Sequence, residues 1–287
     1  MKNHLWLVAA LCLSCLASAA NTAVAPRTLE FASVGEHHLK LDLYRPATPP
    51  AGLIVWVHGG AWRGGSREGV EIKGLVGLGW ALASVDYRLS TQARFPAQIH
   101  DIKAAIRFLR AHAEELGLPP DRFVIAGSSA GGHLAALAGV TDGVAELEGE
   151  VGLDRSSSSR VQAIVDLFGA SNLTTILSQS TPHGLSMRVP ALELLLGGQP
   201  DQVPALARLA SPVFHLDAGD PPLLLLHGDQ DPQMPPAQSA ELAEAARRLG
   251  LKVEWVVVPG AGHGGPAFTS DAQLRRIDAF LRQSLGP

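Results

Sequence analysis

The chain has 287 residues, of which 46% are hydrophobic, and its formal net charge is −4. This length suits one large α/β domain or two small ones. Its 23 basic and 27 acidic residues include no basic run, so the composition argues against nucleic-acid binding.

The N-terminus has the features of a secretory signal peptide. Met1–His4 is a short positive start, Leu5–Leu16 is an apolar run too short to span a bilayer, and Ala17–Ala19 supplies small residues at the cleavage positions. We predict that residues 1–19 are removed, with a cut near Ala25 as second choice. The mature protein is then expected to be periplasmic or extracellular, with no stable insertion in the membrane. The alternative is that the leader stays uncleaved and anchors the protein in the membrane.

Both cysteines of the chain, Cys12 and Cys15, lie in this leader. The residues before Cys15 match a lipid-attachment site poorly, and whether Cys15 is lipidated stays open. The mature chain is expected to have no thiol, so it can form no disulfide and cannot be a cysteine hydrolase.

Apolar strands then alternate with amphipathic helices along the chain. An antiparallel hairpin is expected over Leu29–Leu43. Strands are predicted at Leu53–Val57, Trp80–Asp86, Phe123–Ala126, Val161–Leu167, Pro222–His227 and Val253–Val258, and the main helices at Pro96–Leu116, Pro236–Leu249 and Asp271–Leu285. Continuously apolar strands are typical of a parallel sheet buried on both faces. The alternation predicts a single, doubly wound α/β domain over residues 26–287.

Two segments interrupt this alternation. Thr141–Arg160 is predicted to be a loop. Residues 171–212, rich in Pro, Gly and Leu, follow a predicted strand at the carboxyl edge of the sheet, where a substrate-binding cap would lie.

The segment 127–131 reads Gly-Ser-Ser-Ala-Gly and fits the G-x-S-x-G pattern around Ser129. A predicted strand precedes it, and the helix-compatible run Gly132–Ala138 follows it. Strand, tight turn and helix are the context in which this pattern indicates a nucleophile elbow. Small flanking residues suit such a turn, because glycine tolerates crowded backbone.

A serine hydroxyl needs a base, and the base needs an orienting acid. His263 lies in a glycine-rich loop after the last predicted strand and is the candidate base. Asp231 and Asp229 both follow the preceding strand and are candidates for the acid; Asp229 could instead stabilise the turn. With either one, the order serine, acid, histidine is that of α/β-hydrolases.

An oxyanion hole is predicted from two backbone segments. His58-Gly59-Gly60-Ala61 follows the strand Leu53–Val57 and approximates the HGGG element, so Gly60 and Ala61 are expected to supply N–H donors together with Ala130. Trp62 and Ser128 are expected to contact substrate. No metal-binding or dinucleotide motif is present, so neither a metal nor a cofactor is expected.

These motifs occur in a recognisable order. They are Val57–Trp62, Asp86–Leu89, Phe95–Asp101, Gly127–His133, His227–Pro232 and Pro259–His263. In this respect the chain resembles the esterase and lipase branch of the α/β-hydrolase superfamily. Within that branch it is most similar to the bacterial feruloyl-esterase-like (BD-FAE) and acetyl-xylan-esterase-like group, related to the hormone-sensitive-lipase type.

The resemblance implies an α/β-hydrolase fold with a small cap and the triad Ser129, Asp231 and His263. It also implies that Asp86, Tyr87, Arg88 and Asp101 brace the fold. The HGGG element reads HGGA here, which narrows the space beside the oxyanion and disfavours bulky tertiary-alcohol esters.

We therefore expect an exported serine esterase that cleaves short acyl esters, either small molecules or acetyl and feruloyl groups on plant polysaccharides. An amidase, peptidase or formamidase of the same fold is the alternative. A catalytically silent fold used for binding is a third. The sequence predicts no oligomeric state.

Overall fold

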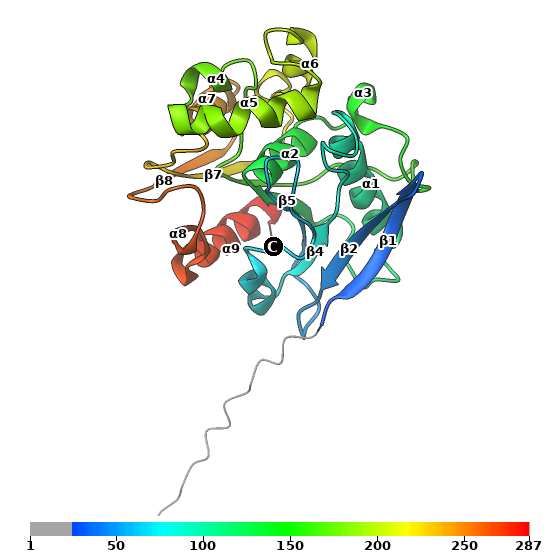
Figure 1. Cartoon of the computed structure of the whole chain (residues 1–287). Coiled ribbons are helices and arrows are strands. Elements are labelled where there is room, and N and C mark those ends of the chain that lie inside the picture. The colour runs from blue at the N-terminus through cyan, green and yellow to red at the C-terminus, as the bar shows by residue number, and fades with distance from the viewer. Residues whose placement is uncertain (1–24, 287) are drawn as a thin grey trace, which may run out of the picture.

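A computed structural model describes residues 25–286 of the chain. The predicted signal peptide and both cysteines lie outside these residues. The described part contains an eight-stranded sheet with the order β1-β2-β4-β3-β5-β6-β7-β8 (Figure 1). β2 is antiparallel to both of its neighbours, and the remaining pairs are parallel. The predicted α/β-hydrolase fold with a mostly parallel, doubly wound sheet is confirmed.

The strands lie close to their predicted positions. They are β1 (Arg27–Val34), β2 (His37–Tyr44), β3 (Leu53–Val57), β4 (Ala81–Val85), β5 (Phe123–Ser128), β6 (Ile164–Leu167), β7 (Leu223–Gly228) and β8 (Val253–Val258). The edge hairpin β1–β2 and the strands β3 and β8 match the sequence-based expectation best. β3 is a continuous apolar run and is completely buried, as expected. β8 was expected to be buried on both faces as well, but it lies at the edge of the sheet and is only partly buried.

Helices cover both faces of the sheet. They are α1 (Ala97–Ala111), α2 (Ala130–Gly139), α3 (Ala145–Glu148), α4 (Ile176–Gln179), α5 (Pro182–Leu196), α6 (Pro204–Leu209), α7 (Ala237–Arg248), α8 (Pro266–Thr269) and α9 (Asp271–Leu285), with 3-10 turns η1 (Lys73–Leu78) and η2 (Pro212–Phe214). Side chains alternate along β3: Val55 joins the core under α1, α2 and α7, whereas Trp56 joins the core under η1, α8 and α9. The strands β3 to β7 are therefore buried on both sides, whereas the edge strands β1 and β8 are partly exposed.

The segment 141–160, predicted as a loop, contains the one-turn helix α3. Glu148 at its end accepts hydrogen bonds from Lys103 Nζ at 2.6 Å and from Arg107 Nη1 at 3.0 Å. Both cations project from α1 and are buried, and a buried cation needs a paired anion. A single turn has too few residues to show helical periodicity, so the sequence pattern could not predict it.

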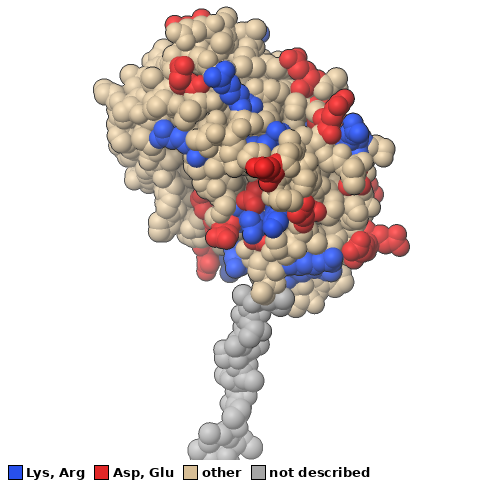
Figure 2. All heavy atoms as spheres, turned by 45° about the vertical axis from the view of Figure 1, so that its right-hand side comes forward, with Lys and Arg blue, Asp and Glu red and all other residues tan. Residues whose placement is uncertain are grey.

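The surface carries no segregated charge on the face drawn in Figure 2, where acidic and basic side chains are interspersed. Within residues 25–286, no helix is both long and apolar enough to cross a membrane.

Residues 171–212, which we call the cap, contain α4, α5 and α6 and lie above the sheet (Figure 1). Near the start of the cap, Gln238 of α7 accepts hydrogen bonds from the backbone N–H groups of Ser171 and Asn172, both at 2.8 Å. Near its end, the carbonyl of Ala210 accepts a hydrogen bond from His133 Nε2 on α2 at 2.6 Å. The cap is thus attached to the core near both ends.

His133 is held in one tautomer by its two partners. Its Nδ1 accepts a hydrogen bond from Trp62 Nε1 at 3.0 Å, so the proton resides on Nε2, which donates to Ala210. Complete burial lowers the pKa of His133 from 6.5 to about 4, because no water solvates the charged form. A protonated ring would also turn Nδ1–H against the Trp62 donor.

We expect the free energy of unfolding to fall as the pH falls from about 6.5 to about 4, because in this window the unfolded chain binds a proton at His133 that the folded chain excludes. The contribution is on the order of 1–3 kcal/mol. Asp166 contributes the opposite slope, since burial raises its pKa to about 7.

Urea unfolding of the wild type and of His133→Gln between pH 4 and 7 isolates the histidine, because Asp166 is common to both proteins. The variant should lose part of the acid destabilisation. Identical pH slopes in the two proteins would contradict the prediction.

Candidate active site

The candidate site lies at the carboxyl ends of the central strands. The strand order reverses at β3, since β4 lies on one side of it and β5 on the other. Ligands of open α/β sheets bind at such a reversal. Val57 at the end of β3 pairs with Gly127 of β5, so the loop after β3 runs beside the elbow after β5.

Ser129 joins β5 to α2 in a strained backbone conformation, with φ 54° and ψ −118°. The two glycines of the pattern are required by space. A Cβ atom at Gly127 would lie 2.3 Å from the carbonyl oxygen of Gly131, and one at Gly131 would lie 2.0 Å from that of Val57. The strained turn places Ser129 at the carboxyl end of β5, where it lines a pocket although it is mostly buried.

Ser129, His263 and Asp231 form a continuous hydrogen-bonded chain. Asp231 Oδ2 accepts from His263 Nδ1 at 2.6 Å, and His263 Nε2 lies 2.8 Å from Ser129 Oγ. Because the carboxylate can only accept, the histidine proton is on Nδ1 and Nε2 is free to accept the serine proton. The three residues follow β5, β8 and β7, as the sequence order predicted.

The carboxylate of Asp231 is completely buried and fully hydrogen-bonded. Oδ1 accepts from the backbone N–H groups of Gln233 and Met234, and His227 Nε2 lies 3.3 Å from Oδ2. Burial by itself would raise the pKa of Asp231, but the hydrogen bonds from His227 and His263 outweigh it and hold the pKa below its usual range. Asp231 therefore stays ionised and keeps His263 oriented.

Asp229, the alternative acid, has another role in the structure. Its Oδ1 accepts the backbone N–H of Gly260 at 2.7 Å, and the residue is exposed. It links the turn after β7 to the turn after β8. Of the two aspartates, Asp231 is the one in contact with His263.

The loop after β3 turns through three consecutive residues with positive φ: Gly60 at 107°, Ala61 at 53° and Trp62 at 59°. Within the described chain, the backbone N–H groups of Gly60, Ala61 and Ala130 donate to no protein acceptor. His58 holds the base of this loop, since its ring stacks on Tyr87 at 4.4 Å and Tyr87 Oη donates to the His58 carbonyl. The unused donors suit the binding of an oxyanion.

Ion pairs connect the segments that follow β3 and β4 to each other and to α1. Asp86 accepts hydrogen bonds from both the backbone and the side chain of Arg67, and buried Asp101 accepts a two-pronged pair from Arg88. These contacts fit the bracing role that the resemblance implied.

A pocket of about 450 Å³ opens above Ser129. Its lining comprises Gly59, Gly60, Ala61, Arg63, Glu71, Ser128, Ser129, Phe168, Met187, Arg188, Gln233, His263, Gly264 and Gly265. Ser128 lies in this lining, and its hydroxyl donates to Glu71 Oε1 at 2.5 Å. Trp62, expected to contact substrate, is instead completely buried with its indole N–H bonded to His133.

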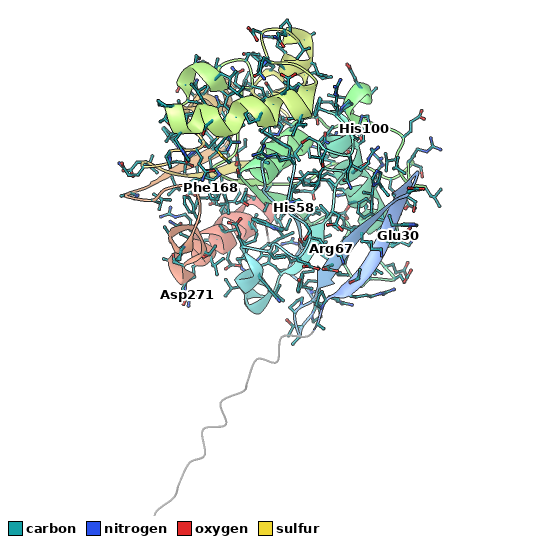
Figure 3. All side chains as sticks on the ribbon, in the orientation of Figure 1. Glu30, His58, Arg67, His100, Phe168 and Asp271 are labelled. Carbon is teal, nitrogen blue, oxygen red and sulfur yellow. The ribbon has the colours of Figure 1, made fainter. Side chains whose placement is uncertain are left out.

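Phe168 and Arg188 are pocket residues that sequence reasoning missed. Phe168 follows β6 and packs its ring against His263 with 4.8 Å between ring centroids. In Figure 3, Phe168 and His58 lie below the cap helix α5. Both missed residues lie outside any recognisable motif, so only the fold brings them to the site.

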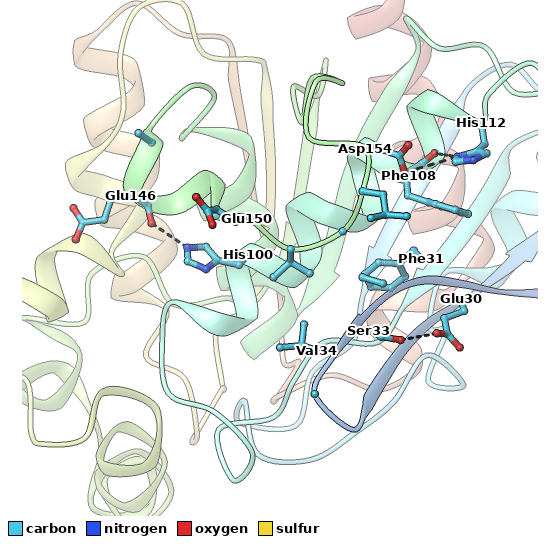
Figure 4. A pocket seen from close by; sticks show the side chains of 17 residues that line it. Glu30, Phe31, Ser33, Val34, His100, Phe108, His112, Glu146, Glu150 and Asp154 are labelled. Atoms are coloured by element: carbon cyan, nitrogen blue, oxygen red, sulfur yellow. Dashed lines mark hydrogen bonds and ion pairs between the residues drawn. The ribbon is translucent and has the colours of Figure 1, made fainter.

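A larger hollow of about 1180 Å³ lies away from Ser129, between β1, α1 and residues 145–154 (Figure 4). Beside it, Ser33 and Glu30 both contact His38 through the same nitrogen, Nδ1. A serine base must use different nitrogens for serine and acid, so this exposed set lacks triad geometry. Among residues 25–286, no group of three or more His, Cys, Asp or Glu side chains is arranged to hold a metal ion.

Comparison with known proteins places the chain in a family. The BD-FAE family model matches residues 41–246. Esterase LipC of Mycobacterium tuberculosis is 35% identical over 232 residues, which cover 78% of this chain and 56% of LipC. The chain thus spans about half the length of the curated relatives it matches.

Solved structures give more complete overlap. A truncated carbohydrate esterase from gut microbiota is 30% identical, with a TM-score of 0.82, and the match covers 92% of this chain and 98% of that one. Esterase 2 of the planctomycete Thermogutta terrifontis, solved with butyrate bound, is 29% identical, with a TM-score of 0.75 over 91% of this chain and 95% of that one. The same esterase has been solved phosphonylated by sarin. The fold, the elbow at Ser129 and these matches agree with one another. The chain belongs to the BD-FAE type of α/β-hydrolase esterases.

Proposed function

We propose that the protein is a serine carboxylic ester hydrolase whose triad is Ser129, His263 and Asp231. The observation that carries the proposal is the hydrogen-bonded chain from Asp231 Oδ2 through His263 to Ser129 Oγ, with contacts of 2.6 and 2.8 Å. An intact chain of this kind also argues against a silent fold used only for binding.

The reaction would proceed through an acyl-enzyme. Ser129 Oγ attacks the ester carbonyl carbon while His263 Nε2 takes the hydroxyl proton. The tetrahedral intermediate collapses, the C–O bond to the alcohol breaks, and His263 returns the proton to the leaving alkoxide. A water molecule then attacks the acyl carbon while His263 accepts its proton. The bond from the acyl carbon to Ser129 Oγ breaks, His263 returns the proton to Oγ, and the carboxylic acid leaves.

The negative charge of each tetrahedral intermediate would be stabilised by the N–H groups of Gly60, Ala61 and Ala130. Loss of one such donor typically costs roughly 3 kcal/mol of transition-state stabilisation. Asp231 would stabilise the transient imidazolium of His263 without itself taking the proton.

Short acyl esters are the proposed substrates. The proposed natural substrates are polysaccharides that carry acetyl or feruloyl groups. The modest pocket supports a small acyl group, as does the butyrate bound to the planctomycete relative. Export to the periplasm or beyond, where such polymers are met, rests on the leader sequence.

Ser129→Ala should lower kcat for p-nitrophenyl acetate at least about thousandfold, because the nucleophile is gone. A fluorophosphonate probe should label the wild type and not this variant. Ser128→Ala is the matched control: it removes a neighbouring hydroxyl of the same pocket and should still be labelled. Wild-type hydrolysis by Ser129→Ala would disprove the assignment.

Asp231→Asn should lower kcat by about 10³–10⁴-fold, because the amide favours the wrong tautomer of His263. Asp229→Asn is its control and should keep most of the activity, since Asp229 contacts Gly260 rather than the histidine. The comparison needs only steady-state kinetics. A reversed ranking of the two variants would make Asp229 the acid.

Acyl length should have a strong effect on kcat/KM. A p-nitrophenyl ester series from acetyl to palmitoyl should peak at two to four carbons, because longer chains exceed the pocket of about 450 Å³. p-Nitroacetanilide in the same series tests the amidase alternative. A maximum at long chains, or faster anilide cleavage, would contradict the proposal.

A further inference from the structure

Arg188 is a buried cation that lines the pocket above Ser129. It lies on the cap helix α5 and is only 1% exposed. Within the described chain, its Nε and Nη1 atoms have no hydrogen-bond partner, although both are sealed from solvent. A guanidinium offers five donors in a fixed fork, and the one on Nε and the two on Nη1 are unused here.

Other buried cations of the protein are paired. Lys103 donates to Glu148 and to the carbonyl of Thr141, and Arg107 donates to Glu148 from Nη1 and to the carbonyl of Val151 from Nη2. Within residues 25–286, the guanidinium of Arg188 contacts only the ring of Trp62, whose centroid is 5.9 Å away, at the limit of a cation–π contact. Leaving a buried charge unpaired costs stability, so a partner for Arg188 is expected.

Charged groups around Arg188 leave it without an available anion. Asp231 attracts it, but the oxygens of that carboxylate are occupied by His263 and by backbone N–H groups. Arg63, from the loop after β3, repels it. Glu71 shares the pocket but is exposed and accepts from Ser128. The residues that line the pocket therefore include two arginines, Arg63 and Arg188, and one carboxylate residue, Glu71, which already accepts a hydrogen bond from Ser128.

We propose that Arg188 binds a carboxylate carried by the ester substrate, on either its acyl or its alcohol part. The proposal rests on the proposed esterase function and specifies its substrate class. A planar carboxylate fits the guanidinium fork with two parallel hydrogen bonds. A neutral substrate offers the guanidinium no anion, so the site is expected to discriminate between charged and neutral esters. Esters of uronic acids and half-esters of dicarboxylic acids belong to this class.

Two matched pairs of esters test the proposal and locate the carboxylate. 4-Acetoxybenzoate and 4-acetoxybenzamide differ in charge on the alcohol side. The p-nitrophenyl monoester of glutaric acid and p-nitrophenyl valerate differ on the acyl side. The wild type should prefer the anionic member of one pair in kcat/KM by roughly tenfold to hundredfold.

Arg188→Met should reduce this anionic-to-neutral ratio by the same factor, and Arg188→Lys should reduce it less because the charge remains. Intrinsic ester reactivity cancels when ratios are compared between variants. The control is Arg208→Met on α6, an arginine of the cap that also stacks on a ring, Phe214 at 3.8 Å, but lies outside this pocket. It should keep the wild-type ratio.

Wild-type ratios near one in both pairs, with the neutral esters hydrolysed, would overturn this inference and leave the esterase proposal standing. Should none of the four esters be hydrolysed, the esterase proposal fails. Calorimetry with glutarate and glutaramide then decides on Arg188: preferential binding of glutarate by the wild type but not by Arg188→Met supports the site, and equal binding rejects it. If Arg188→Met does not fold, the same calorimetric comparison with Arg188→Lys decides.

Discussion

The close approach of three backbone segments at the end of β5 is the constraint on which the rest of the site depends. Gly127, Gly131 and the carbonyl of Val57 are in contact with no room for a Cβ atom. This contact forces Ser129 into its strained conformation and brings the β3 loop beside it. The same packing arrangement therefore positions both Ser129 and the unused backbone N–H groups of the loop after β3. The burial of apolar side chains in the two cores around the sheet offsets the backbone strain.

A second hydrogen-bond network orients His263. Asp231 is held through both oxygens, and His227, itself completely buried between Ser239 and Met234, approaches the same carboxylate. The carboxylate of Asp231 cannot rotate without breaking several hydrogen bonds at once, so His263 keeps one tautomer and one direction. Phe168 packs against its ring and limits its tilt.

Much of this architecture could be predicted from the sequence, for identifiable reasons. Buried strands such as β3 and β7 contain unbroken apolar runs, and the elbow glycines are local requirements of the chain. Choosing Asp231 rather than Asp229 as the partner of His263 needed the family resemblance. The two residues are only two positions apart, and the sequence does not reveal which of their side chains points toward the histidine. Arg188 and Glu71 could not be foreseen, since their place in the pocket depends on how the cap and the segment after β3 fold over it.

The attachment of the cap near both ends has an evolutionary consequence. Gln238 holds its start and His133 holds its end, and both of these residues belong to helices packed on the sheet. The stretch between these two anchors touches the core at further points, since Leu195 accepts the backbone N–H of Phe95 and Thr181 donates to the carbonyl of Pro232. Sequence change in the cap is therefore expected to be tolerated at its exposed positions, such as Val189 and Leu194, rather than at its buried ones.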